Sequence, residues 1–182
     1  MKIVKNISLL FAASALFLAG CGDDVSSPGV DNEREVFTTV KLTLISSDKD
    51  TVTAAFNDAD GEGGIAGSFA GSLKLKAGKT YMSSLTLLDE SDPKNIANMG
   101  EEVLEEGVDH QVFYTVSTSN LTVEYADKDA KGNPIGLMTT FKAMTAGSGK
   151  VQVMLRHQPG VKDGKITSGE TYVEVEFPFT VE

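Results

Sequence analysis

The stretch that decides the fold is Tyr-Val-Glu-Val-Glu-Phe-Pro-Phe-Thr-Val at residues 172–181, in which apolar and polar side chains alternate. Valine or phenylalanine occupies every second position from Val173 to Val181, with glutamate, proline or threonine between them. Because successive side chains of a β-strand point to opposite faces, this pattern predicts a strand with one face in a core and the other toward water. Pro178 falls on the polar face and favours the edge of a sheet, since proline has no backbone N–H to donate.

The same alternation recurs upstream, beginning with the segment from Val36 to Ile45. Turn-forming residues separate the alternating segments, for example at 147–149 and 162–165. The pattern predicts further strands at residues 36–45, 51–56, 65–75, 80–88, 111–117, 121–125, 137–143 and 151–157. We therefore expect residues 36–182 to form an all-β domain, an immunoglobulin-like or Greek-key β-sandwich of about nine strands.

One short helix is expected at residues 93–106. Asp92 can cap its first turn, Pro93 suits the first helical position, and Gly107 can end it. Its apolar face would comprise Ile96, Met99 and Val103.

The first 20 residues have a composition of their own. Lys2 and Lys5 precede an uncharged, largely apolar run at 7–19, which ends in small residues before Cys21. This order is typical of a secretory signal peptide. An apolar run of about a dozen residues is also too short for a bilayer core of about 30 Å. We therefore expect residues 1–20 to be a cleaved signal peptide rather than a membrane-spanning or buried helix.

Leu18-Ala19-Gly20-Cys21 resembles the bacterial lipobox. The resemblance implies cleavage before Cys21, acylation of that cysteine, and lipid anchoring of the mature chain in a membrane. Gly22 stands where many inner-membrane lipoproteins have aspartate, so the resemblance favours the outer membrane. The start Cys-Gly-Asp-Asp at 21–24 is also similar to surface-exported lipoproteins of Bacteroidota, so the domain would face the periplasm or the cell surface. Cys21 is the only cysteine, and no intramolecular disulfide is expected.

Residues 21–35 are polar and predict a flexible acidic tether between the lipid and the domain. The whole chain has 16 basic and 26 acidic side chains, and residues 1–20 hold two of the basic ones and no acid. The mature chain therefore has 14 basic against 26 acidic side chains, a net charge near −12. Such a charge excludes nucleic acid and anionic lipid head groups as partners. It leaves the membrane, through the lipid anchor, and an envelope protein as candidate partners.

A cation site is one interpretation of the loop that holds Asp58, Asp60 and Glu62. Alternate carboxylates beside a glycine suit Ca²⁺, which takes six to eight oxygen ligands. The segment at 127–133 has a similar pattern, although two lysines in it oppose a cation. The alternative for both segments is an ordinary polar hairpin loop, in which aspartate, asparagine and glycine are favoured for backbone reasons.

His110 and His157 are the only histidines, and each lies at the end of a predicted strand. With a nearby carboxylate they could bind Zn²⁺ or Cu²⁺ if the fold brings them together. The sequence alone does not determine whether it does. The alternative interpretation is two unrelated residues at strand ends.

Enzyme motifs are absent from the sequence. There is no Gly-x-Ser-x-Gly, and Gly78-Lys79-Thr80 lacks the upstream glycine of a phosphate-binding loop. The glycine-rich segment at 61–66 is followed by a strand pattern rather than a helix, which excludes a dinucleotide fingerprint. We therefore expect a protein that is not an enzyme.

Three segments, residues 101–114, 127–134 and 155–159, are similar to those of small secreted lipoproteins of Bacteroidota. Some members of that group are labelled with the type 1 periplasmic binding fold. That fold requires two α/β lobes with repeated helices, whereas this sequence predicts one helix.

The preferred hypothesis is a non-catalytic, membrane-anchored envelope lipoprotein that binds a ligand or a partner protein, with Ca²⁺ as a possible cofactor at the 58–62 loop. The alternative hypothesis is an accessory lipoprotein that captures a metal or haem for an outer-membrane transporter through His110 and His157.

Overall fold

The computed structural model describes residues 35–60 and 64–182. Several predicted features lie outside the described residues. They are the signal peptide, Cys21, the tether except Glu35, and Glu62. Eleven strands and one helix are present in the described part of the chain. No helix in that part has both the length and the apolar character needed to cross a bilayer.

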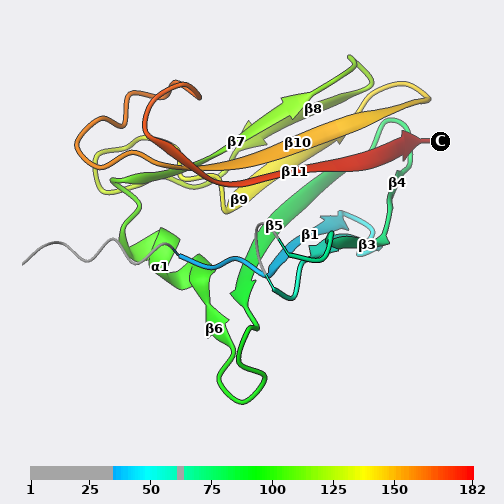
Figure 1. The fold of residues 1–182 in the computed structure, drawn as a ribbon. Coiled ribbons are helices and arrows are strands. Elements are labelled where there is room, and N and C mark those ends of the chain that lie inside the picture. The colour runs from blue at the N-terminus through cyan, green and yellow to red at the C-terminus, as the bar shows by residue number, and fades with distance from the viewer. Residues whose placement is uncertain (1–34, 61–63) are drawn as a thin grey trace, which may run out of the picture. The chain divides into compact units, whose positions relative to one another are not determined.

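The strands form two sheets that lie in separate layers (Figure 1). The first sheet has the order β3-β2-β1-β5-β9-β8, with β6 paired to β5, and the second has the order β4-β11-β10-β7. The strands of the first sheet are β1 (Thr39–Ser46), β2 (Thr51–Asn57), β3 (Ser68–Gly71), β5 (Thr80–Asp89), β6 (Ala97–Asn98), β8 (Leu121–Tyr125) and β9 (Met138–Ala143). Those of the second are β4 (Leu73–Leu75), β7 (His110–Val116), β10 (Gly147–His157) and β11 (Glu170–Val181).

This strand order is that of an immunoglobulin-like sandwich. In that fold one sheet has the order A-B-E-D and the other contains C, F and G. The order β1-β5-β9-β8 reproduces the first pattern, and β7-β10-β11 reproduces the second. Strand β4 adds to the second sheet by pairing in parallel with the end of β11. The all-β sandwich expected from the sequence is confirmed.

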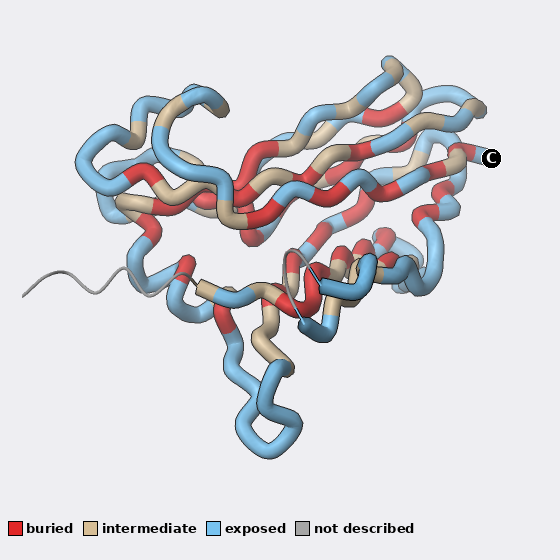
Figure 2. Tube along the Cα trace, viewed as in Figure 1, coloured by how far each residue is buried: buried red, intermediate tan, exposed pale blue. Residues whose placement is uncertain are grey.

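The core lies between the two sheets and is built mainly from alternate residues of the long strands, such as β1, β5, β10 and β11 (Figure 2). All five apolar residues of β11 from Val173 to Val181 are buried, as the alternation predicted. On the first sheet, Val40, Leu42 and Leu44 of β1 are buried in the same way. Each buried aliphatic or aromatic side chain contributes about 1.5–3 kcal/mol, so these two stripes hold the layers together.

The expectation of an edge position for Pro178 is wrong, because β11 lies between β10 and β4. Strand β4 pairs only with Phe179, Thr180 and Val181. Pro178 therefore stands just outside the stretch of β11 that pairs with β4, where its missing N–H interrupts no pairing with that strand.

The single strand expected at 65–75 is two strands in different sheets. Gly71 ends β3 with φ at 75°, in the left-handed region, and β4 begins two residues later in the second sheet. A Cβ at this position would meet the Thr53 carbonyl oxygen at 2.4 Å. The turn therefore requires glycine both for its backbone angle and for its close approach to β2.

The helix α1 (Met99–Glu105) is shorter than expected. Asp92 does not cap it; its carboxylate accepts the N–H of Lys94 in a turn, and the helix begins after Asn98. The residues between them form a turn and the strand β6, which pairs with β5. The end of the helix agrees with the expectation, since the Gly107 N–H donates to the Leu104 carbonyl.

Candidate functional site

The two histidines are direct neighbours across two antiparallel strands. His110 is the first residue of β7, His157 is the last residue of β10, and the register pairs them with each other. Their rings stack with centroids 4.7 Å apart and planes 22° apart. Side chains at opposed positions of an antiparallel pair have Cβ atoms about 5 Å apart, so the register itself brings the imidazoles together. The structure thus brings the two histidines together, so they are not unrelated residues at strand ends.

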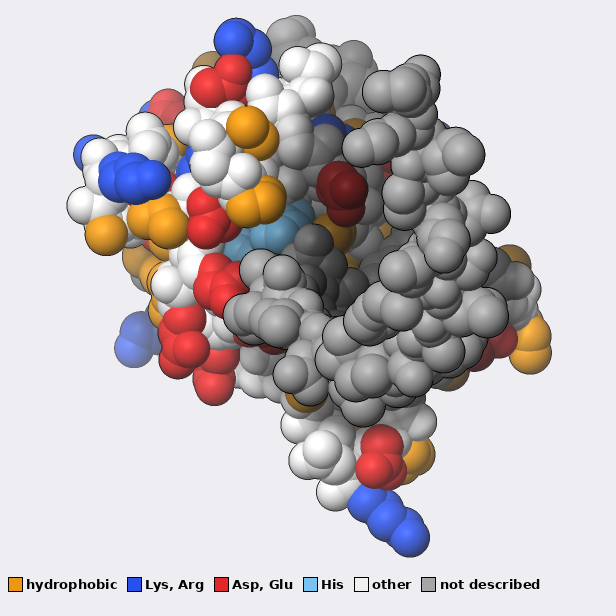
Figure 3. Space-filling model, turned by 60° about the vertical axis from the view of Figure 1, so that its left-hand side comes forward, with side chains coloured by type: hydrophobic (Ala, Val, Ile, Leu, Met, Phe, Trp, Pro, Cys, Tyr) orange, Lys and Arg blue, Asp and Glu red, His pale blue; other side chains and the backbone are white. Residues whose placement is uncertain are grey.

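Carboxylates surround the buried ring of His110. Its side chain has no exposed surface, and its Nδ1 lies 4.0 Å from the Glu106 Oε2 and 3.3 Å from the Glu106 carbonyl oxygen. Its Nε2 lies 3.6 Å from the Glu35 Oε1. The Glu106 side chain is 55% exposed and that of Glu35 is 12% exposed. On this face of the molecule, histidine surface lies next to acidic side chains (Figure 3).

Five side chains of this region form two overlapping groups of possible metal ligands. Glu106, His110 and His157 offer ligand atoms that all lie within 4.8 Å of one another. A second group with the same spacing shares Glu106 and adds Glu35 and Glu102. Imidazole nitrogens with carboxylate oxygens are a ligand set that suits Zn²⁺ and other first-row divalent metals. We call these five residues the histidine–carboxylate cluster.

Tyr172 of β11 fixes the orientation of His157. Its hydroxyl lies 2.6 Å from the His157 Nδ1, and the two ring centroids are 4.8 Å apart. With Nδ1 hydrogen-bonded to the tyrosine, Nε2 is the nitrogen left to bind a metal. Histidine ligands usually hydrogen-bond through their second nitrogen in this way. The pKa of the Tyr172 hydroxyl is raised by burial and by the nearby carboxylates, first among them Glu35, which keeps it protonated.

Negative charge accumulates on the helix side of the cluster. The pKa of Glu102 is raised, first by burial and then by repulsion from Glu35 and Glu106, with His110 opposing the shift. Three carboxylates that repel one another at this distance are stabilised by a bound cation. The electrostatics of the cluster therefore favour a metal ion over an anion.

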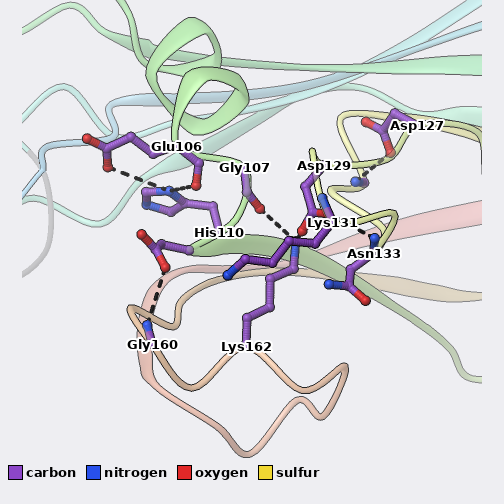
Figure 4. Close-up of polar contacts among 11 residues, drawn as sticks. Glu106, Gly107, His110, Asp127, Asp129, Lys131, Asn133, Gly160 and Lys162 are labelled. Carbon is purple, nitrogen blue, oxygen red and sulfur yellow. Dashed lines mark hydrogen bonds and ion pairs between the residues drawn. The ribbon is translucent and has the colours of Figure 1, made fainter.

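A buried ion pair supports the chain just before His110 (Figure 4). The Lys162 ammonium donates to the Asp129 Oδ2 at 2.8 Å and to the Gly107 carbonyl at 2.7 Å. The side chains of Lys162 and Asp129 are 3% and 0% exposed. One lysine thus ties the β10–β11 loop and the β8–β9 loop to the end of the helix segment that carries Glu106. We call this contact the Lys162 clip.

The loop at 127–133 uses its carboxylates within the protein. The Asp129 Oδ1 accepts the N–H groups of Lys131 and Asn133. Asp127 accepts those of Gly136 and Met138. Burial alone would raise the pKa of Asp129, but Lys162 and the two N–H groups lower it to about 2. These contacts agree with the hairpin-loop interpretation of this segment rather than with the cation site.

The predicted calcium loop is described only in part. The Asp60 Oδ2 accepts the Ile65 N–H at 2.9 Å, and this hydrogen bond lowers the pKa of Asp60. Asp58 lies at the end of β2, where its N–H donates to the Thr38 carbonyl at 2.7 Å. Neither aspartate belongs to a group of three possible ligands among residues 35–60 and 64–182. With Glu62 outside the described residues, calcium binding stays a prediction.

Fold and cluster define a small immunoglobulin-like sandwich with a histidine–carboxylate cluster at one end. No protein-family model matches the chain, and no curated protein matches it. Among solved structures it is similar to a crystal structure of domains 4 and 5 of the S-layer protein SbsC, at 11% identity and a TM-score of 0.33. That alignment covers 80% of this chain and 70% of the other.

Proposed function

We propose that this domain is a non-catalytic metal-binding module of an envelope lipoprotein, which captures Zn²⁺ or Cu²⁺ at Glu106, His110 and His157. The observation that carries the proposal is the convergence of the only two histidines of the chain with an exposed glutamate. This proposal combines the two hypotheses from the sequence. The first predicted a non-catalytic binding protein, and the second predicted that the ligand is a metal ion or haem.

The ligand atoms of Glu106, His110 and His157 lie within 4.8 Å of one another, so they must move closer together to bind a metal ion. Zinc binds imidazole nitrogens and carboxylate oxygens at about 2.0–2.2 Å, so the three side chains would draw together around it. The Glu106 side chain is 55% exposed, whereas that of His110 is fully buried in the sheet. Glu35 or Glu102 can supply a further oxygen.

The negative charge of the domain and its predicted lipid anchor are both consistent with metal capture. An acidic domain attracts cations from its surroundings, which raises their local concentration at the surface. We propose that lipid on Cys21 retains the domain at the outer membrane, where a captured metal can pass to a transporter. Replacement of Cys21 by serine should abolish labelling with radioactive palmitate and release the protein from membranes; a labelled or membrane-bound C21S variant would contradict the anchor.

Equilibrium dialysis of the mature, metal-free lipoprotein against Zn²⁺, Cu²⁺ and haemin tests the ligand. We expect one equivalent of Zn²⁺ or Cu²⁺ to bind to the native protein and the affinity to fall at least tenfold in His157→Gln and Glu106→Gln. Glu105→Gln is the matched control, because Glu105 is the neighbouring exposed acid of the same helix and belongs to neither ligand group. Binding of haemin with neither metal bound would redirect the proposal to haem capture. Equal metal binding by the native protein and His157→Gln would refute it.

A further inference from the structure

A cavity of about 620 Å³ opens beside the histidine–carboxylate cluster, between the segment that leads into β1, the end of β2 and the first half of β11. Its lining includes Glu35, Phe37, Phe56, Asp58, Tyr172 and Val175. Cavities of about 300–1,000 Å³ are the usual size for small organic ligands. The volume therefore suits a molecule much larger than a metal ion.

Two carboxylate oxygens on this lining lack hydrogen-bond partners. The Glu35 Oε2 and the Asp58 Oδ1 are both buried and unpaired among the described residues. The other oxygen of Glu35 lies toward His110, at 3.6 Å from its Nε2. A buried polar group without a partner costs about 1–3 kcal/mol, and more when it is charged. Both oxygens accept hydrogen bonds, so the missing partner is a donor.

Aromatic and aliphatic side chains form another part of the wall. The ring of Phe37 packs against that of Tyr172 with centroids 6.2 Å apart, and Phe56 packs against Phe69 at 5.0 Å. Valines 40, 173 and 175 complete the apolar surface. Aromatic faces attract cations, and apolar walls bind hydrocarbon. The cavity thus combines acceptors for a charged donor with a surface for a carbon skeleton.

The sign of the ligand's charge follows from the titratable residues around the cavity. Those that line it are Glu35, Asp58, Asp60, Tyr172 and Glu174. None of the described residues of the lining is lysine, arginine or histidine. An anionic ligand would therefore meet only repulsion there, whereas a cation would meet none.

Backbone and side-chain hydrogen bonds hold the chain around Asp58 in place. The Asp58 N–H donates to the Thr38 carbonyl at 2.7 Å, and the Thr39 hydroxyl donates to the Asn57 Oδ1 at 3.1 Å. The Thr38 N–H donates to the Leu88 carbonyl at 2.9 Å. These contacts join the start of β1 to the end of β2 and the end of β5, so the backbone that carries Asp58 is fixed before a ligand arrives.

We propose that this cavity binds a small organic amine, whose ammonium group donates to Glu35 and Asp58 and whose hydrocarbon part lies against Phe37, Phe56 and Tyr172. This site is separate from the proposed metal centre, although both use Glu35. A bare cation such as Ca²⁺ would satisfy the carboxylates but leave the apolar wall uncovered. The walls therefore favour an organic ion.

Isothermal titration calorimetry of the mature, EDTA-treated lipoprotein tests the proposal with phenethylamine as the probe. The control ligands are 2-phenylethanol, which has the same skeleton without the charge, and 3-phenylpropanoate, which has the opposite charge. We expect the amine to bind at least tenfold more tightly than the alcohol, and the carboxylate not to bind, because one charge-assisted hydrogen bond is worth about one decade of affinity.

The variants Glu35→Gln and Asp58→Asn should each weaken amine binding about tenfold and leave the binding of the alcohol unchanged. Glu170→Gln is the matched control, an exposed acid at the start of β11 that does not line the cavity. Circular dichroism of each variant verifies that the fold is retained. Glu106→Gln should lower zinc affinity without affecting the amine, which separates this site from the metal centre.

Four results would overturn the proposal. The first three are no binding of the amine at millimolar concentration, equal binding of amine and alcohol, and unchanged amine affinity in both carboxylate variants. Displacement of the amine by an equimolar amount of Ca²⁺ would also overturn it, since the carboxylates would then belong to an inorganic ion.

Discussion

His110 and His157 stand opposite each other at the ends of β7 and β10, with ring centroids 4.7 Å apart and the His110 side chain fully buried. Two stacked imidazoles contribute little to the core of a sandwich that valine or leucine would fill better. Glu106 forms one group of possible ligands with both histidines, and Glu35 approaches the Nε2 of His110 at 3.6 Å. This relationship is the physical basis of the proposed metal centre.

Replacing Tyr172 with phenylalanine should weaken zinc binding by about 10–100-fold, because it removes the hydrogen bond that orients His157 and keeps the aromatic ring. A competition titration against a chromophoric chelator measures the affinity. The free energy of unfolding should fall by only about 1 kcal/mol. If Tyr172→Phe binds zinc as tightly as the native protein, the hydroxyl has no part in positioning the ligand.

Replacing Lys162 with methionine should destabilise the domain by about 3–5 kcal/mol, because it leaves the buried Asp129 carboxylate without its cation. Urea denaturation followed by circular dichroism measures the free energy of unfolding. The matched control is Lys165→Met, which breaks a pair with Asp163 in which the lysine is 72% exposed, and it should cost less than about 1 kcal/mol. Equal effects of the two substitutions would show that the Lys162 clip behaves like a surface pair.

Low pH should lower the stability of the domain by protonating Asp129 in the Lys162 clip. The pKa of Asp129 in the folded protein is about 2, below its ordinary value of 3.8, so the folded state binds fewer protons there than the unfolded state. A lowered carboxyl pKa contributes stability above pH 3.8 that is lost as the pH falls toward 2. The melting temperature of the native protein should therefore decline between these pH values. In Asp129→Asn the decline should be shallower, and an identical pH profile for the two proteins would argue against this role.

Gly71 should be more sensitive to substitution than Gly78, although both lie in turns. Gly71 and Gly78 have nearly the same backbone angle, φ 75° and 72°, but a Cβ at Gly78 meets nothing within 4 Å. Gly78→Ala should therefore cost only the left-handed backbone penalty of about 1 kcal/mol. Gly71→Ala adds a clash with the Thr53 carbonyl and should cost clearly more, as measured by thermal unfolding. Equal costs would mean that β2 yields to the added methyl group.

Local patterns in the sequence were sufficient for most of the strands. The segments predicted at 51–56, 80–88 and 121–125 differ from β2, β5 and β8 by at most one residue at either end. The alternation of the last strand correctly identified its buried face, from Val173 to Val181. These predictions succeeded because the period-two pattern of a half-buried strand is a local property.

The errors arose where distant contacts override local preference. Asp92 and Pro93 have the chemistry of a helix start, yet the chain there forms a turn and then pairs with β5 before α1 begins. The alternating segment at 65–75 is divided by Gly71, because its two halves belong to different sheets. No local signal shows which sheet a strand will join.

The site was only partly accessible from the sequence. The sequence predicts His110 and His157 as possible ligands together with a nearby carboxylate, and Glu106 is one of the acids just before His110. It does not identify Glu35, Glu102 or Tyr172 as neighbours of the histidines. Tyr172 and Glu35 lie on distant segments, and no spacing in the chain connects them with the histidines.

The sequence by itself determined that residues 36–182 would form a β-sandwich, because apolar and polar residues alternate along its strands. It also supplied an acidic surface and a single pair of histidines. The tertiary structure decided the register that sets His110 against His157, and the packing that brings Glu35, Glu106 and Tyr172 around them. The reason is physical. Alternation depends on neighbours along the chain, whereas strand pairing depends on which hydrophobic faces meet across the core, and that is settled only when the whole domain is folded.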